Sequence, residues 1–117
     1  MQTYKDLTVW QKSMDLTTKI YVLTRALPKE EIYGLTNQLR RAAVSIPSNI
    51  AEGNGRFSQK EYARFLSVAR GSNAEVETQL LLCVKLGYIQ SSETDEALSL
   101  CTEIGKMLTA MIVKFTT

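Results

Sequence analysis

The chain has 117 residues, 44% of them hydrophobic and 22% charged, and its 14 basic and 12 acidic side chains leave a net charge of +2. This length predicts one domain, residues 1–117, that buries roughly two-thirds of the surface its unfolded chain would expose. Histidine is absent, which excludes the Glu-x-x-His ligands of di-iron bundles and the hydrolase sites that use a histidine base.

Helical periodicity predicts four helices and no strand. The first is expected from about Thr8 to Ala26, where Thr8 and Gln11 have the spacing of a capping box and Pro28 prevents continuation. Its apolar stripe comprises Val9, Leu16, Ile20, Leu23 and Leu27.

The second helix is expected to begin near Gly34 or Leu35 and to end at Gly53 and Gly55. Pro47 lies inside it, at a cost of roughly 3 kcal/mol, because proline lacks an amide donor and its ring crowds the carbonyl of Ala43. We expect a kink at Pro47. The stripe of this helix comprises Leu35, Leu39, Ala42, Ile46, Ile50 and Gly53.

Two interpretations of the kink remain open. In the first, the kink only fits the helix to the core, and the freed carbonyl groups accept hydrogen bonds from Ser45, Ser48, Asn49 or water. Alternatively, Ser48, Asn49 and Glu52 form a functional polar cluster there.

The third helix is expected to be the longest, from a second capping box at Ser58 and Glu61 to Gly87. Ser92 is expected to cap the fourth helix. The stripe of the third helix is Tyr62, Phe65, Leu66, Ala69, Asn73, Val76, Leu80, Cys83 and Val84, and that of the fourth is Ala97, Cys101, Ile104, Leu108, Met111 and Phe115.

Short connections make consecutive helices antiparallel, so the sequence predicts an all-α, up-down-up-down four-helix bundle. Apolar residues beyond a single stripe imply either cover at the sides of the bundle or an interface between copies, and we expect a homo-oligomer. These residues are Trp10, Met14, Tyr21, Leu98, Leu100, Met107 and Ile112.

The N-terminal segment carries Asp6, Thr8 and Gln11 where a signal peptide needs a continuous apolar stretch. With no long apolar run elsewhere, we expect a cytoplasmic protein without a membrane partner. Cys83 and Cys101 lack Cys-x-x-Cys spacing and are expected to be reduced core thiols.

Charge is unevenly distributed along the chain. Residues 36–70 carry six basic and two acidic side chains, whereas residues 71–105 carry one basic and six acidic side chains. Such asymmetry favours either an anionic partner or a contact between the basic side of one subunit and the acidic side of the next.

Basic residues are the main candidates for a functional site. Arg56, Lys60 and Arg64 recur every four residues and are expected to share one face at the start of the third helix, where the helix dipole also favours an anion. Arg40, Arg41 and Arg70 extend the candidate set, although Arg40 and Arg41 point about 100° apart and are not expected to share one patch. The segment shows no interleaved aromatic platform. The alternative interpretation is a solvated face or salt bridges between subunits.

Metal and enzyme chemistry find little support. Glu52, Glu75 and Glu77 lack the dense Asp/Asn spacing of a calcium loop, and the glycines at 53 and 55 do not form a phosphate loop. We expect no metal, no cofactor and no enzymatic activity; an enzyme that uses carboxylates alone would need a strongly perturbed Glu52 or Glu75.

Four segments resemble the bacterial four-helix-bundle proteins encoded in intervening sequences of 23S ribosomal RNA genes: Tyr4–Gln11, Tyr33–Ala43, Ser45–Gly53 and Phe65–Glu75. The resemblance spans nearly the whole chain and implies a ring-shaped homopentamer. That family is similar in turn to the accessory bundle protein of diversity-generating retroelements, which associates with a reverse transcriptase and nucleic acid.

Two functions follow. The first is binding of RNA or DNA phosphates by Arg40, Arg41, Arg56, Lys60, Arg64 and Arg70. The second is a structural or adaptor oligomer that binds a protein such as a reverse transcriptase without touching nucleic acid, its basic residues pairing with Glu75, Glu77, Glu93 or Glu96 of a neighbouring subunit.

Overall fold

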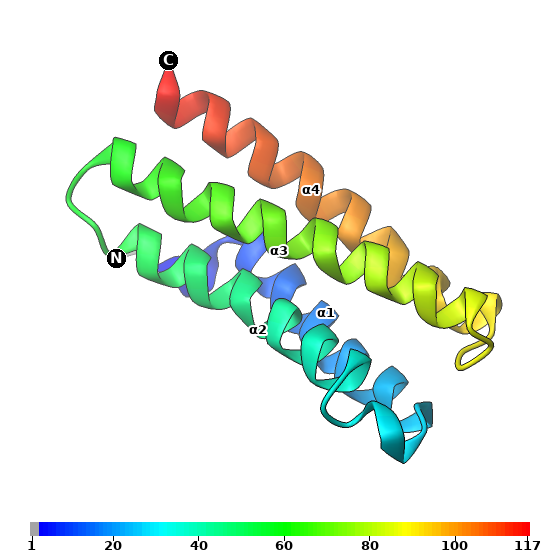
Figure 1. Ribbon diagram of the computed structural model, residues 1–117. Helices are drawn as coiled ribbons and strands as arrows, with labels where there is room; N and C mark the ends of the chain where they lie inside the picture. The colour runs from blue at the N-terminus through cyan, green and yellow to red at the C-terminus, as the bar shows by residue number, and fades with distance from the viewer. Residues whose placement is uncertain (1–2) are drawn as a thin grey trace.

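The computed structural model describes residues 3–117. Within that range there is no strand, and four long helices dominate: α1 (Thr8–Leu23), α2 (Leu35–Asn54), α3 (Gln59–Lys85) and α4 (Asp95–Thr116). Figure 1 shows consecutive helices side by side and running in opposite directions. Each of α1 and α3 packs against both α2 and α4. The prediction of an all-α four-helix bundle is confirmed.

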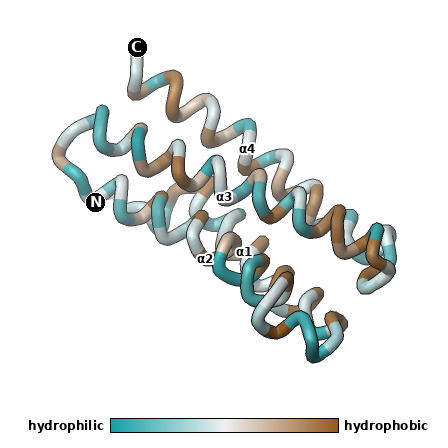
Figure 2. Tube along the Cα trace, in the orientation of Figure 1, coloured by the Kyte–Doolittle hydropathy of each residue, from teal (hydrophilic) through white to brown (hydrophobic). Residues whose placement is uncertain are grey.

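Apolar stripes from all four helices form the core, and Figure 2 shows apolar residues recurring along each helix. Cys83 and Cys101 are free and buried, as expected, and burial raises the pKa of the Cys101 thiol to about 12. Side chains that are completely inaccessible include Leu16, Ile20, Leu39, Ile46, Ile50, Leu66, Leu80, Ile104 and Leu108.

The surplus apolar residues divide into two groups. Five are partly buried against the core and act as side cover within the bundle: Trp10, Leu98, Leu100, Met107 and Ile112. Met14 and Tyr21 of α1 are exposed. Of the seven residues, Met14 and Tyr21 therefore offer the most apolar surface to a partner.

Two predicted caps are wrong, because short 3-10 turns lead into the helices. The turn η1 (Tyr4–Asp6) precedes α1, so Leu7 is the N-cap of α1 and makes no side-chain bond. The side chain of Gln11 instead donates to the carbonyl of Lys5, at 2.9 Å. Likewise Ser92 lies inside the turn η4 (Ser91–Thr94), whose capping box joins Gln90 and Glu93.

Two further 3-10 turns, η2 (Thr24–Ala26) and η3 (Lys29–Glu31), connect α1 to α2. At the start of α3 the Ser58 hydroxyl accepts a bond from the Glu61 amide at 3.0 Å, as predicted. The Glu61 carboxylate binds Arg64 and not the backbone amide of Ser58, which would complete the capping box.

The helix α2 continues through Pro47, and the bend expected there stays a prediction. The Ala43 carbonyl that Pro47 deprives of its helical donor lies 3.0 Å from the Thr17 hydroxyl of α1. Ser45 and Asn49 bond to each other instead. The Thr17 hydroxyl has a single proton and also lies 2.8 Å from the Ser13 carbonyl, so it is shared between the two acceptors. The side-chain donor nearest to the freed carbonyl therefore comes from α1, and not from the polar residues of α2 as expected.

Gly53 does not end α2. It is buried inside the last turn, and a Cβ atom there would lie 2.6 Å from Cβ of Phe65 and 3.1 Å from Cδ1 of Tyr62. The absence of a side chain lets α2 approach α3 closely at this level. The final residue of the helix is Asn54, and Gly55 follows as its C-cap.

Candidate nucleic-acid interface

Arg56, Lys60 and Arg64 lie where α2 turns into α3, and we call these three residues the basic tip. The Arg56 guanidinium donates to Glu52 at 3.0 Å, and the Arg64 guanidinium donates to both carboxylate oxygens of Glu61 at 3.1 and 3.2 Å. The bond from Arg64 lowers the pKa of Glu61 and raises that of Arg64. Arg56 lies in the connection before α3, so the three residues do not share one face of that helix as expected, although Arg56 and Arg64 both reach the Phe65 ring.

The two arginines of the basic tip also cover an aromatic ring. Their guanidinium carbons lie 4.8 Å and 4.6 Å from the centroid of Phe65, within the range of a cation–π contact. Lys60 is exposed and forms no salt bridge with residues 3–117. The basic tip therefore has two anchored cations and one free cation.

Arg40 is used inside the bundle. Its Nε donates to the Thr24 hydroxyl at 2.9 Å, its Nη2 donates to the Tyr21 carbonyl at 3.4 Å, and its guanidinium lies 4.6 Å from the centroid of the Tyr21 ring. These contacts tie α2 to the end of α1. Sequence reasoning missed this role, because the partners are sixteen and nineteen residues away and carry no charge.

Arg41 is exposed and lines a shallow depression together with Arg40, Tyr21 and Val44. Arg41 also lines a second depression, with Ser72 and Glu75 on the α3 side, so the expectation that Arg40 and Arg41 do not share one patch stays a prediction.

Arg70 is exposed on α3 but faces away from α2. Ser72 faces α2, since its hydroxyl donates to Ser45 at 2.8 Å, and a residue two positions earlier is rotated by about 200°. Arg41 in turn lies about 20 Å along α2 from the basic tip. The six predicted residues thus do not form one continuous surface in a single chain.

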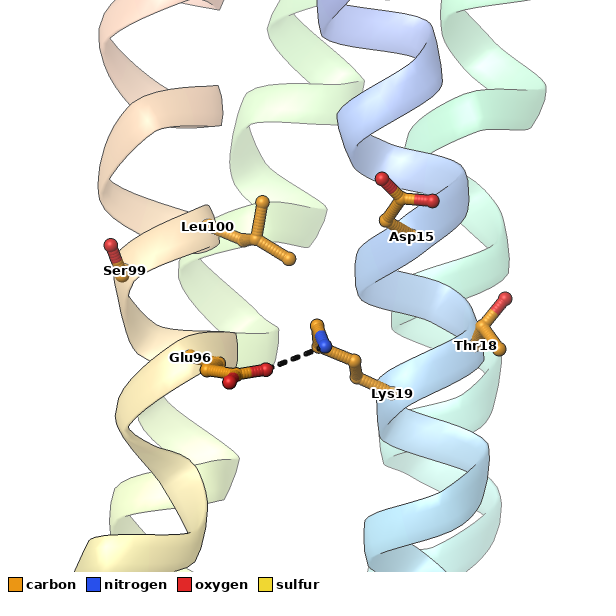
Figure 3. A pocket seen from close by; sticks show the side chains of 6 residues that line it. All are labelled: Asp15, Thr18, Lys19, Glu96, Ser99 and Leu100. Atoms are coloured by element: carbon orange, nitrogen blue, oxygen red, sulfur yellow. Dashed lines mark hydrogen bonds and ion pairs between the residues drawn. The ribbon is translucent and has the colours of Figure 1, made fainter.

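Two of the six acidic residues in 71–105, Glu96 and Glu103, pair with lysines of α1 and not with the basic segment. Lys19 binds Glu96 at 2.8 Å and Lys12 binds Glu103 at 2.6 Å. Figure 3 shows the Lys19–Glu96 pair spanning a depression between α1 and α4, which Asp15 and Leu100 also line. Hydrogen bonding across this pair raises the pKa of Lys19 and lowers that of Glu96.

The polar residues after Pro47 do not converge. The Asn49 amide donates to the carbonyl and hydroxyl oxygens of Ser45, at 2.7 and 2.9 Å, whereas Glu52 binds Arg56. Ser48 lines a different depression beside Trp10. These contacts favour the structural interpretation of the segment over a shared functional cluster.

Neither a metal site nor a membrane span emerges between residues 3 and 117. No group of three or more cysteine, aspartate or glutamate side chains there could hold a metal ion. No helix in the same range is long and apolar enough to cross a membrane.

Comparison with known proteins identifies the family. The family model described as 23S rRNA-intervening sequence protein matches residues 5–110. The chain belongs to this family. The predicted resemblance is thereby confirmed, whereas the relation to retroelement accessory proteins stays a prediction.

A solved structure from Bacteroides thetaiotaomicron, described as a protein with unknown function from the S23 ribosomal protein family, has the same fold. It is 26% identical, with a TM-score of 0.82, and the alignment covers 90% of this chain and 98% of that one. None of the curated proteins matches. The descriptions of the family and of this neighbour name no enzymatic activity.

Proposed function

We propose that this member of the 23S rRNA-intervening sequence protein family is a non-enzymatic protein of the bacterial cytoplasm that binds RNA or DNA, with the basic tip as its principal contact. The observation that carries the proposal is the convergence of Arg56, Lys60 and Arg64 at one end of the bundle, with Lys60 exposed and outside any salt bridge of residues 3–117. Such a site binds phosphates without reading bases.

The anchored arginines suit this role for a physical reason. Glu52, Glu61 and the Phe65 ring hold both guanidinium groups in place, so that little side-chain freedom is lost on binding a phosphate. Exposed Arg41 and Arg70 supply further phosphate contacts to a longer ligand, whereas Arg40 chiefly stabilises the bundle.

A salt titration tests the proposal. Binding of a fluorescent 20-nucleotide RNA and of the matching DNA is measured by anisotropy across sodium chloride concentrations. Replacement of Arg56, Lys60 and Arg64 by alanine is expected to weaken binding and to reduce the slope of log K against log salt by about 2 to 3, since each phosphate contact contributes about 0.7 to 0.9.

The control removes the same charge elsewhere. Lys29, Lys85 and Lys106 are exposed lysines outside the basic tip, and their triple replacement by alanine is expected to leave most of the binding. Equal losses in the two triple variants would mean that net charge alone drives binding, and undetectable binding of wild type at low salt would refute the proposal.

A second candidate function, a structural or adaptor oligomer that binds a protein such as a reverse transcriptase, is favoured by the outer face of α3. Val68, Gly71 and Leu82 share this face with exposed Glu75 by helical spacing. Val68 and Leu82 are exposed, and a Cβ atom at Gly71 would meet nothing within 4 Å. We propose that this face joins subunits of a homo-oligomer, with the homopentameric ring implied by the family resemblance.

Light scattering tests the assembly. Wild type is expected to be larger than the 13.1 kDa chain, and Leu82→Glu is expected to reduce its mass, because the substitution places a charge in the apolar contact. Val113→Glu changes an exposed residue of α4 and serves as the control. A wild-type monomer at ordinary salt would contradict this candidate.

A further inference from the structure

Phe57 lies in the short connection between α2 and α3, and its side chain is fully exposed. Figure 1 shows this connection as the loop beyond the ends of both helices. Phenylalanine is normally among the most buried residues, and burying its ring would stabilise the fold. The exposure of Phe57 therefore calls for a reason outside the packing of one chain.

Other aromatic rings at this end of the bundle have partners within the chain. Tyr62 stacks on Phe115 with ring centroids 4.8 Å apart, and Phe65 lies beneath the two arginines of the basic tip. Phe57 makes no aromatic or cation–π contact with residues 3–117. Both faces of its ring are open to a ligand.

Cations adjoin this open ring in the sequence. Arg56 directly precedes Phe57, and Lys60 follows it in the first turn of α3. The expectation that the basic segment lacks an aromatic platform overlooked this residue. A flat ring beside phosphate-binding side chains is the combination that single-strand binding proteins use, with bases on the ring and the backbone along the cations.

We propose that Phe57 stacks on an unpaired base, so that the ligand of the basic tip is single-stranded RNA or DNA. This inference rests on the proposed function and adds the class of nucleic acid. Duplex bases are already stacked on one another and present only their edges, so a ring at the protein surface finds no free base face in a duplex.

The surroundings of Phe57 favour this ligand over an apolar one. Within residues 45–67, all of which the structure describes, Phe57 is the only exposed large apolar side chain; outside that range, Val68 of α3 and Val113 of α4 are also exposed. An amphipathic helix or a lipid surface needs a broader apolar face than one ring provides. A single base needs only one ring.

The experiment compares three 12-nucleotide probes at one low salt concentration: an unstructured oligouridine, a duplex, and a DNA backbone of the same length made of abasic units. The variants are Phe57→Ala, Phe57→Trp and Tyr33→Ala, the last removing an exposed aromatic from the connection between α1 and α2. Circular dichroism verifies that each variant folds. Phe57→Ala is expected to weaken oligouridine binding about 5- to 150-fold while leaving the abasic probe unchanged.

Retained binding by Phe57→Trp and by Tyr33→Ala completes the supporting result. If Phe57→Ala leaves oligouridine binding unchanged and replacement of the basic tip weakens it, the stacking inference is overturned and the proposed function is retained. Weakening of duplex binding by Phe57→Ala to the same extent as oligouridine binding would also overturn the stacking inference, because a duplex offers no free base face. Absence of binding to every probe would overturn both proposals.

Discussion

The two ends of the bundle differ in how their connections are bonded, although each has an exposed aromatic ring, Tyr33 at one end and Phe57 at the other. At one end Glu31 accepts a bond from the Leu35 amide at 3.1 Å and another from the Tyr88 hydroxyl at 3.0 Å, which joins the α1–α2 connection to the α3–α4 connection. At the other end Phe57 and Lys60 face solvent. Arg56 and Arg64 are bonded within the chain and also reach the surface, so they contribute both to folding and to the proposed binding, whereas Phe57 and Lys60 contribute little to folding.

Two phenylalanines near the basic tip are expected to show the largest difference between a buried side chain and an exposed one. Phe65→Ala is expected to destabilise the protein by about 3–5 kcal/mol, because the ring is buried between α2 and the two arginines. Phe57→Ala is expected to change stability by less than about 0.5 kcal/mol. Chemical denaturation measures the free energy of unfolding of both variants. Equal losses would contradict the difference in burial between Phe65 and Phe57.

Two helical glycines extend the comparison to the sides of the bundle. Gly53→Ala is expected to lower stability by about 1–2 kcal/mol, since the new Cβ atom would press on Cβ of Phe65 and the backbones must separate. Gly71→Ala has open space and is expected to raise stability by roughly 0.5–1 kcal/mol through helix propensity. Thermal melts at low protein concentration show whether each variant gains or loses stability. A higher melting temperature for Gly53→Ala would contradict close packing of α2 against α3 at Gly53.

Two neighbouring threonines separate an internal from an exposed hydroxyl. Thr17→Val removes the donor closest to the carbonyl that Pro47 frees, so we expect a loss of about 1–2 kcal/mol. Thr18→Val removes an exposed hydroxyl that bonds only within its own helix, to the Met14 carbonyl, and is expected to be nearly neutral. Urea titration of both variants tests whether α1 supplies that donor.

The smallest expected effect belongs to the exposed pair of Lys19 and Glu96. Because the pKa of Glu96 lies below its ordinary value of 4.5, its contribution to stability is complete above that value and is lost as the pH falls through the folded pKa. Glu96→Gln is therefore expected to lower the melting temperature slightly at pH 7, less at high salt, and not at all in acid. Glu30→Gln, which changes an exposed carboxylate outside the salt bridges of residues 3–117, is the control. A salt-independent loss for Glu96→Gln would argue against an ion pair.

The apolar stripes were predictable because helical spacing alone decides which residues face a core. Leu39, Leu66 and Ile104 are buried where the period places them. The start of α1 was not predictable in detail, since the η1 turn displaces the expected cap from Thr8 to Leu7.

Contacts between distant residues of different helices escaped sequence reasoning altogether. The Thr17 hydroxyl near Ala43 and the side chain of Arg40 on Thr24 depend on how helices pair in space. Exposure of Phe57 is likewise a tertiary property, because a phenylalanine between two helices reads in the sequence as a core residue. Four-residue spacing alone predicted that Arg56, Lys60 and Arg64 lie near one another. The same spacing did not predict how far Arg41 lies from these three residues.

Amide chemical-shift mapping tests the central claim most directly. Unlabelled oligouridine is titrated into nitrogen-15-labelled protein, and the perturbed residues are placed on the bundle. Perturbations are expected to cluster at residues 55–64 around the basic tip, with little change at Glu31, Leu35 and Tyr88. Perturbations centred on the Glu31 end, or spread evenly over all four helices, would contradict the account.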